Sequence, residues 1–262
     1  MKLSNGLIAN LAERLESCQL EVRDTVKITD EHPDLDWEDA YAVQDEILKR
    51  KLERGLRIIG LKAGLTSHAK MKQMGVSSPV FGFMTNDYLV QDGGEVQMNE
   101  LIHPKVEPEI AFILNKSLTG PGCSIADVLN ATAFVLPGIE VIDSRYKDFK
   151  FDLKSVVADN TSATRFVIGG IASPVKGIDL STLGVILEKN GSSVAYGVGA
   201  AVLGNPATAV AMLANHLAER GKEIPAGAIV LSGGITEAVS VSKGDVLTLK
   251  VHGMGSTSIR FI

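Results

Sequence analysis

Two glutamates, Glu107 and Glu109, lie in the segment Lys105-Val106-Glu107-Pro108-Glu109-Ile110-Ala111-Phe112-Ile113-Leu114, where apolar residues surround them. Side chains two residues apart in a strand point to the same face, about 6.6 Å apart along it. The two carboxylates are therefore expected to converge on one spot. Pro108 between them cannot donate to a β-ladder, which predicts an edge, a bulge or a strand start at that point.

A third acid, Glu140, is the charged residue of the otherwise apolar segment 133–142. A carboxylate in such a strand costs free energy unless a cation balances its charge. Mg²⁺ would account for all three acids, because it prefers oxygen ligands in an octahedron and keeps several waters that a chelating substrate can replace. The alternative is that the first two acids form a solvated strand face while Glu140 pairs with Lys62 or Arg145. Spacing alone favours that alternative.

A lone lysine, Lys62, interrupts the apolar segment 58–65, and the pair Thr66-Ser67 follows as a helix-capping signal. A buried lysine needs an anion or loses its proton, and the free N–H groups of a helix start can bind a carboxylate. Lys62 is therefore a candidate catalytic residue, and Thr66 and Ser67 are candidate substrate ligands. An ordinary salt bridge beside a capped helix would produce the same pattern.

Two loops combine short polar groups or glycines with a neighbouring apolar strand: Asp159-Asn160-Thr161-Ser162 and Ser232-Gly233-Gly234-Ile235-Thr236. In either loop, backbone amides can approach a ligand. The candidate substrate-binding residues in them are Asp159, Ser162, Gly233, Gly234 and Thr236. The same composition marks turns in general, and that alternative is favoured when each loop is taken alone.

The elements that must position these residues are of two kinds. Residues 1–56 contain two amphipathic helical patterns, at 3–15 and at 40–52. From 57 to 262, short apolar runs alternate with glycine, asparagine and proline, which predicts strands and turns with few helices. We therefore expect a helical N-terminal region, 1–56, packed on a β-rich catalytic domain, 57–262.

Several elements of the second part have clear boundaries. Asn190-Gly191 follows the strand pattern 184–187 and predicts a hairpin turn. Asn205-Pro206, a cap residue followed by a first-turn proline, predicts a helix that stops at Gly221. Two further strands are expected at 246–251 and 256–262.

Composition narrows the classes of partner. The chain has 262 residues with 45% hydrophobic and 22% charged residues and a net charge of −5, so it can bury a sizeable core. Because no basic run is present, nucleic acid and anionic membranes are excluded as expected partners. No stretch approaches the roughly 18 apolar residues of a membrane span, and no leader pattern is visible, which predicts a cytoplasmic location. The histidines lack metal-binding spacing, which argues against zinc.

In combination, these motifs resemble the fumarylacetoacetate hydrolase superfamily, in its branch of 4-oxalocrotonate (2-oxo-3-hexenedioate) decarboxylases and 2-hydroxypentadienoate hydratases of aromatic meta-cleavage pathways. The resemblance covers nearly the whole chain and depends on five segments in the same order: 60–67, 106–110, 140–145, 157–160 and 255–262. Other branches have aspartate in place of Glu140. Leu61 before Lys62, together with segments 149–153 and 232–236, resembles decarboxylases more than hydratases.

The resemblance implies an α+β fold, with a mixed β-roll behind a small helical N-terminal region. It implies a Mg²⁺ or Mn²⁺ site formed by Glu107, Glu109 and Glu140. It also implies that Lys62 orients the substrate by its charge or donates a proton. The implied activity is that of a carboxy-lyase, the metal-dependent decarboxylation of 2-oxo-3-hexenedioate to 2-hydroxypenta-2,4-dienoate and CO₂.

Two other functions stay open at this point. A hydratase of the same branch would use the same metal and add water to the terminal double bond. A non-catalytic subunit would instead bind the hydratase that consumes the labile product, because decarboxylases of this branch associate with that enzyme. The expected partners are the 2-oxo dicarboxylate substrate, further copies of the chain in a homo-oligomer, and the hydratase.

Overall fold

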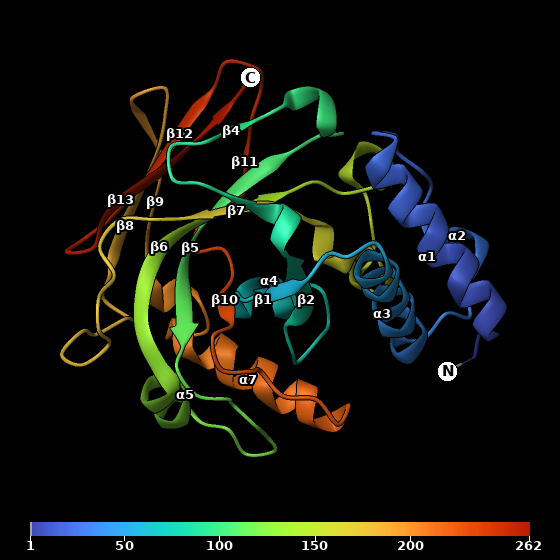
Figure 1. The fold of residues 1–262 in the computed structure, drawn as a ribbon, viewed down its shortest axis with the longest axis horizontal. Coiled ribbons are helices and arrows are strands. Elements are labelled where there is room, and N and C mark those ends of the chain that lie inside the picture. The colour runs from blue at the N-terminus through green and yellow to red at the C-terminus, as the bar shows by residue number, and fades with distance from the viewer. Residues whose placement is uncertain (1) are drawn as a thin grey trace.

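A computed structural model describes residues 2–262. The helices of the N-terminal part lie at one end of the molecule, a small sheet lies at the other end, and a larger curved sheet runs between them (Figure 1). The predicted α+β class with a mixed, curled sheet is confirmed. No helix within residues 2–262 has the length and apolar character needed to cross a bilayer.

The N-terminal part contains three helices: α1 (Asn5–Leu20), α2 (Ile28–Glu31) and α3 (Trp37–Glu53). Asp36 caps α3 in a capping box with Asp39, which satisfies free N–H groups of the first turn. Apolar residues of α1 and α3 form one cluster with β2 and α6. The predicted division at residues 56 and 57 falls between α3 and β1, and across this division the hydrophobic packing is continuous.

The larger sheet has eight strands in the order β2-β1-β10-β5-β6-β7-β3, with β11 paired to β5. The pairs β1 with β10 and β3 with β7 are parallel, and the remaining pairs are antiparallel. The strands are β1 (Ile58–Gly64), β2 (Val80–Thr85), β3 (Leu89–Val90), β5 (Lys105–Leu114), β6 (Thr132–Ile142), β7 (Ala163–Ile168), β10 (Ile229–Leu231) and β11 (Val239–Ser240).

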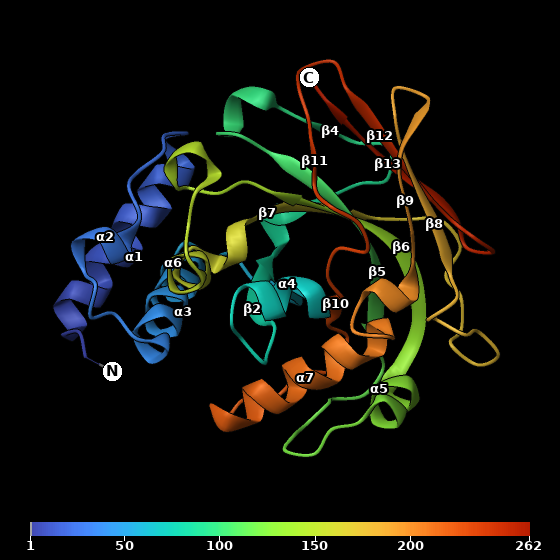
Figure 2. The ribbon, with the colours of Figure 1, turned by 180° about the vertical axis from the view of Figure 1, so that it is seen from behind.

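The smaller sheet has five strands in the order β4-β13-β12-β8-β9. They are β4 (Glu95–Val96), β8 (Gly184–Lys189), β9 (Ser192–Val198), β12 (Val246–Val251) and β13 (Gly255–Phe261). The predicted hairpin turn at Asn190-Gly191 joins β8 to β9, and both residues have positive φ. The smaller sheet stands at the end of the molecule opposite the N-terminal helices, as the view from behind also shows (Figure 2).

The main hydrophobic core lies between the two sheets and under α7. Alternate residues of β5, namely Val106, Ile110 and Phe112, are fully buried in this core with residues of β6, β12, β13 and α7. Because side chains alternate across a strand, the residues between them in β5 point to the other face of the sheet. Glu107 and Glu109 therefore turn away from the core between the sheets.

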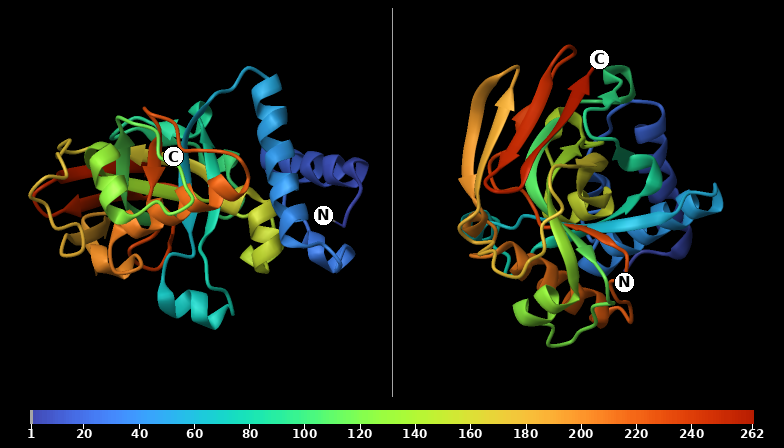
Figure 3. Two further views of the ribbon diagram at one scale, coloured as in Figure 1. Left: turned by 90° about the horizontal axis from the view of Figure 1, so that it is seen from below. Right: turned by 60° about the vertical axis from the view of Figure 1, so that its left-hand side comes forward.

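Four further helices connect and cover the strands: α4 (His68–Gln73), α5 (Ile125–Ala131), α6 (Leu153–Ala158) and α7 (Pro206–Glu219). Asn205 caps α7 and Pro206 occupies its first turn, as predicted, and Gly221 follows with positive φ. Figure 3 shows α4 projecting from the body of the molecule beneath the sheet. Short 3₁₀ helices occur at η1 (Asn86–Tyr88), η2 (Met98–Glu100), η3 (Lys147–Phe149), η4 (Asn160–Ser162) and η5 (Gly199–Ala201).

Candidate metal and substrate site

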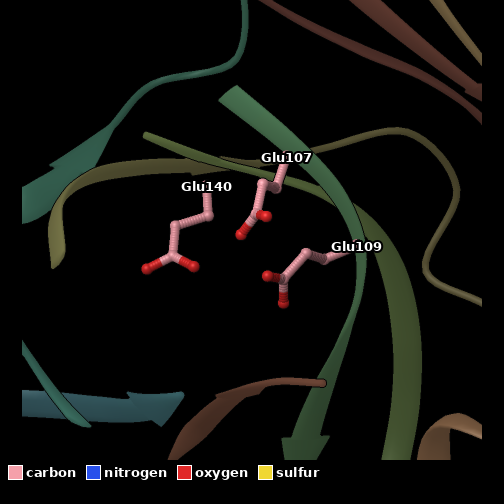
Figure 4. A group of neighbouring side chains, drawn as sticks. All are labelled: Glu107, Glu109 and Glu140. Atoms are coloured by element: carbon pink, nitrogen blue, oxygen red, sulfur yellow. The ribbon is translucent and has the colours of Figure 1, made fainter. Parts of the chain in front are cut away.

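The three glutamates are brought together by the pairing of β5 with β6. Glu107 lies directly opposite Glu140, and Glu109 lies opposite Gly138 one step along the same face. Carboxylate oxygens from all three residues lie within 4.8 Å of one another, and they converge in Figure 4. Adjacent like charges on paired strands are unfavourable without a counter-charge, so this register favours a cation between them.

Pro108 lies at a local edge of the larger sheet. On one side, β5 pairs without interruption with β6 through this position. On the other side, β11 pairs with residues 105–106 and β10 with residues 111–113, so that pairing is broken around Pro108. The missing N–H of proline therefore leaves no ladder bond unsatisfied, and the predicted edge is confirmed.

Two of the three glutamates are almost completely buried. Glu109 is 0% exposed and Glu140 is 1% exposed, whereas Glu107 is partly exposed. Burial raises the pKa of Glu109 well above its usual range, and the neighbouring Glu140 carboxylate adds to that rise. Burial also raises the pKa of Glu140, although the Lys62 ammonium opposes the effect. Bare carboxylates are therefore unfavourable at this site, which favours a bound cation between them.

A divalent cation fits the donor set. Glu109 Oε1 and Glu140 Oε2 are buried and accept no hydrogen bond from the described residues, whereas Glu140 Oε1 lies in an ion pair with Lys62. Buried acceptors without a hydrogen-bond donor are rare in folded proteins, and a bound cation would satisfy both of these oxygens at once. Three carboxylates match the preference of Mg²⁺ for oxygen ligands and would leave coordination positions for a chelating substrate.

Lys62 of β1 lies on the same face of the larger sheet as the glutamates, and β10 is the strand between β1 and β5. Lys62 pairs with Leu231, and Leu231 pairs with Ala111 in β5, two residues after Glu109. The Lys62 ammonium is buried and lies 2.7 Å from Glu140 Oε1 and 3.2 Å from the carbonyl oxygen of Thr161, to which it donates. The salt bridge considered as the alternative to a metal site is thus present, and it is compatible with the cluster because Glu140 has a second oxygen.

The glycine-rich loop 232–236 crosses the break in strand pairing beside Pro108. The Gly233 N–H donates to Glu109 Oε2 at 2.7 Å. A Cβ at Gly233 would lie 2.1 Å from Thr66 Oγ1, and a Cβ at Gly234 would lie 2.9 Å from the carboxylate carbon of Glu107. Gly233, which has a φ of +102°, therefore needs glycine, and a side chain at Gly234 would displace the Glu107 carboxylate, a relation that sequence composition did not reveal.

The turn η4 holds Lys62 from the other side. Its residues Asn160, Thr161 and Ser162 all have positive φ, which is rare for residues other than glycine. The Asn160 side chain donates to the Phe83 carbonyl oxygen at 3.0 Å and accepts from the Phe83 N–H at 2.9 Å. This amide clamp fixes the turn against β2, and the Thr161 carbonyl oxygen thereby faces Lys62.

The other predicted substrate-binding residues differ in position. Asp159 is buried and its carboxylate pairs with Arg145, while burial raises the pKa of Asp159 to about 6. Ser162 is buried and its hydroxyl lacks a partner among the described residues.

Thr66 packs against Gly233 as described above, and the Ser67 carbonyl oxygen accepts the Met71 N–H at the start of α4. The partly buried Thr236 donates to the carbonyl oxygen of Glu237. Substrate contact by each of these residues stays a prediction.

A large cavity lies elsewhere in the molecule. A cavity of about 650 Å³ is lined by α3, β1, β2 and α7, with Phe81, Phe83 and Leu61 among its apolar residues. Leu61 and Phe83 are paired in the sheet and alternate with Lys62, so this cavity lies on the face opposite the lysine. Cavity size alone would therefore point away from the glutamates.

Comparisons with known proteins agree with this geometry. The 4-oxalocrotonate decarboxylase of Pseudomonas sp. (strain CF600) is 55% identical over 260 residues, which cover 99% of this chain and 98% of the relative. The 2-hydroxyhexa-2,4-dienoate hydratase of Comamonas testosteroni is 39% identical over 256 residues, covering 97% of each chain. No family model matches the sequence.

Solved structures give the same result. The 4-oxalocrotonate decarboxylase from Pseudomonas putida G7, complexed with magnesium and adipate, has a TM-score of 0.98 and 52% identity, covering 100% of this chain and 99% of that one. Fumarylpyruvate hydrolase from Pseudomonas aeruginosa has a TM-score of 0.61 at 16% identity, covering 79% and 90%, which shows a shared fold. The fold and the carboxylate cluster thus define an α+β protein with a candidate metal site on its larger sheet. Within that class, the chain belongs to the 4-oxalocrotonate decarboxylase family.

Proposed function

We propose that this chain is a Mg²⁺-dependent carboxy-lyase that converts 2-oxo-3-hexenedioate to 2-hydroxypenta-2,4-dienoate and CO₂ in meta-cleavage degradation of aromatic compounds. The observation that supports the proposal best is the buried cluster of Glu107, Glu109 and Glu140 beside Lys62. Membership in the decarboxylase family, with hydratases as more distant relatives, selects this reaction among those that the cluster allows.

The reaction needs an electron acceptor at the 2-oxo end of the substrate. Cleavage of the bond to the far carboxylate carbon releases CO₂, and its electron pair moves along the conjugated chain to the keto oxygen. A proton then completes the 2-hydroxydienoate. Mg²⁺ held by the three glutamates would supply a Lewis acid that stabilises the charge developing on that oxygen.

Lys62 can assist at the same oxygen. An ammonium has three N–H donors, and those of Lys62 are shared between Glu140, the Thr161 carbonyl oxygen and one further direction. We propose that this remaining donor orients the keto oxygen or gives it a proton. Because Glu140 and η4 hold the ammonium, little reorganisation is needed during the reaction.

Apolar residues border the cluster on the same face. Phe166 lies opposite Glu140 in β7, and Ala111 and Leu231 continue the face beyond Glu109. These side chains exclude water from one side of the site, which strengthens charge interactions within it. A water-poor site favours loss of CO₂ over addition of water.

The test is an assay of the purified chain with 2-oxo-3-hexenedioate, with and without Mg²⁺, in which products are identified by mass. The proposal predicts release of CO₂ that requires the metal. A chain that leaves 2-oxo-3-hexenedioate unchanged but converts 2-hydroxypenta-2,4-dienoate to a product heavier by one water would be a hydratase. Turnover that appears only after a hydratase is added would identify a non-catalytic subunit.

We also propose that the chain forms a homo-oligomer, binds a hydratase of the same branch and resides in the cytoplasm. The chemistry supports the second partner, because a 2-hydroxydienoate ketonises in water and direct transfer would limit that loss. Co-expression with such a hydratase, followed by size-exclusion chromatography with light scattering, is expected to show a mixed complex. Independent elution of both proteins at micromolar concentration would remove the hydratase from the proposal and leave the decarboxylase assignment intact.

A further inference from the structure

Lys105 lies on the same face of β5 as the glutamates. It pairs with Ile142 of β6 and with Ser240 of β11, and the register from Lys105 to Glu109 is unbroken. Because side chains recur on one face every second residue, Lys105, Glu107 and Glu109 form a row with steps of about 6.6 Å. A cation therefore follows the carboxylate cluster along the strand, toward its N-terminal end.

Lys105 has an aromatic neighbour and, among the described residues, no ion-pair partner. Its ammonium lies 4.2 Å from the ring centroid of Phe149. Among the described side chains, no carboxylate lies within ion-pair distance of it, although the side chain is half-buried. A partly desolvated ammonium held by an aromatic face can still attract an anion.

His103 faces the same ring. The centroids of His103 and Phe149 are 5.4 Å apart, and His103 Nε2 is buried without a hydrogen-bond partner among the described residues. The backbone N–H of His103 donates to Asp143 Oδ1 at 2.7 Å, which fixes this residue at the start of β5. A buried unpartnered ring nitrogen beside an unpaired ammonium indicates a site for an anionic ligand.

Phe149 is presented by a constrained turn. Asp148 and Phe149 in η3 have φ of 56° and 58°, a conformation that such residues rarely adopt. The Phe149 ring also packs at 5.6 Å from that of Phe151. The turn thus places an aromatic wall next to both Lys105 and His103.

We propose that Lys105 and His103 bind the far carboxylate of the dicarboxylate substrate, while the glutamate cluster serves its 2-oxo end. This inference rests on the proposed function and adds a residue pair that selects dicarboxylates over monocarboxylates. The far carboxylate loses its charge as CO₂ forms, so contacts to it stabilise the bound substrate more than the transition state. Lys105 therefore lowers KM without raising kcat.

The test compares Lys105→Met with Lys105→Arg and with Lys250→Met, a control in which an exposed lysine of β12 loses its ion pair with Glu188. Kinetics with 2-oxo-3-hexenedioate are measured together with calorimetric binding of adipate and of 2-oxopentanoate to Mg²⁺-loaded protein.

For Lys105→Met we expect KM and the adipate Kd to rise about 10- to 100-fold, the scale of a hydrogen bond to a charged group. The 2-oxopentanoate Kd is expected to stay within about twofold, and kcat is expected to be unchanged or higher, because the lost contact stabilised the bound substrate more than the transition state. Lys105→Arg should recover most of the adipate affinity, and Lys250→Met should resemble the unmodified chain.

Equal weakening of adipate and 2-oxopentanoate, or unchanged adipate binding, would overturn the assignment. His103→Gln provides a second probe should Lys105→Met fail to fold, and it should weaken adipate in preference to 2-oxopentanoate. The calorimetric comparison does not need turnover. If the chain is inactive but its adipate affinity still depends on Lys105, the proposed reaction is refuted while the assignment of Lys105 stands.

Discussion

Glu109 and Glu107 differ in their surroundings although they share one strand face. Glu109 is fully buried and accepts the Gly233 N–H, whereas Glu107 is partly exposed. Each contributes one charged oxygen ligand to the proposed Mg²⁺ site, so Glu107→Gln and Glu109→Gln should each lower Mg²⁺ affinity at least about tenfold and abolish metal-dependent turnover. Isothermal titration of Mg²⁺ is the measurement, and circular dichroism should show a retained fold.

The matched control for these substitutions is Glu95→Gln. Glu95 is an exposed residue of β4 that pairs with Arg260 in the smaller sheet. Its loss should leave Mg²⁺ affinity unchanged, because exposed ion pairs contribute little and this one lies away from the cluster. Unchanged affinity in both ligand variants would eliminate the metal assignment of these glutamates.

Lys62 has a structural contact and a proposed catalytic role, which a substitution can separate. Lys62→Ala should reduce kcat at saturating Mg²⁺ by at least ~10², the scale of a directed proton donor. It should also change Mg²⁺ affinity, because Glu140 loses its ion-pair partner. Near-normal kcat combined with a lower Tm would assign Lys62 to a structural salt bridge only.

At the scale of elements, the loop 232–236 links the strand β10 to the glutamates. Gly233 has a φ of +102°, and a side chain there would meet Thr66. Gly233→Ala should therefore displace the loop, remove the N–H bond to Glu109 and lower both Tm and Mg²⁺ affinity. Titration calorimetry and thermal unfolding measure the two effects.

Gly227→Ala serves as the control for the loop. Gly227 also has a positive φ, +83°, but a Cβ there would meet nothing within 4 Å. Gly227→Ala should lose about 1 kcal/mol of stability from backbone strain alone, and its Mg²⁺ affinity should stay intact. Equal effects of both variants on Mg²⁺ affinity would show that the loop does not support the cluster.

Elements with local signals were predictable from sequence. Asn205 caps α7 as predicted, because capping depends on a few adjacent residues, and the helical pattern at 40–52 lies within α3. Alternation along β5 likewise placed Glu107 and Glu109 on one face. Their pairing with Glu140 was a hypothesis until the register of β5 with β6 was known, because alternation does not identify the partner strand.

Other features had no signal that sequence reasoning could use. The turn η4 needs three consecutive positive φ values, including that of the β-branched Thr161, and such residues normally avoid that region. Its conformation is imposed by the Asn160 clamp on β2, a contact between distant segments. The carboxylate of Asp159 forms an ion pair with Arg145, which no local sequence pattern indicated, and substrate contact by Asp159 stays a prediction.

For the whole molecule, the buried carboxylates make stability depend on pH and metal. Because the pKa of Glu109 is raised in the folded state, the folded state favours the protonated form relative to the unfolded chain. The corresponding stability is fully present below the unfolded pKa, near 4.5, and is lost as pH rises through the folded pKa. Glu140 has a raised pKa and acts in the same direction.

We therefore expect the Tm of EDTA-treated protein to fall as pH is raised from about 5 to about 8, and Mg²⁺ to restore Tm most strongly at the upper end. Differential scanning calorimetry across that range is the measurement. Glu109→Gln, which cannot ionise, should show a flatter profile. A Tm of the metal-free protein that rises over this range would contradict the expected sign.

The position of β10 between β1 and β5 has a consequence for the timing of folding. Lys62 and Glu109 belong to strands that are joined through Ile229–Leu231, a segment far along the chain. During synthesis, a nascent chain that ends before this segment lacks the strand that sets Lys62 beside the glutamates. Contacts of such long sequence separation form late, after the cost of closing the intervening chain. A bound cation is consequently expected to slow unfolding of the folded protein while leaving the rate of folding almost unchanged.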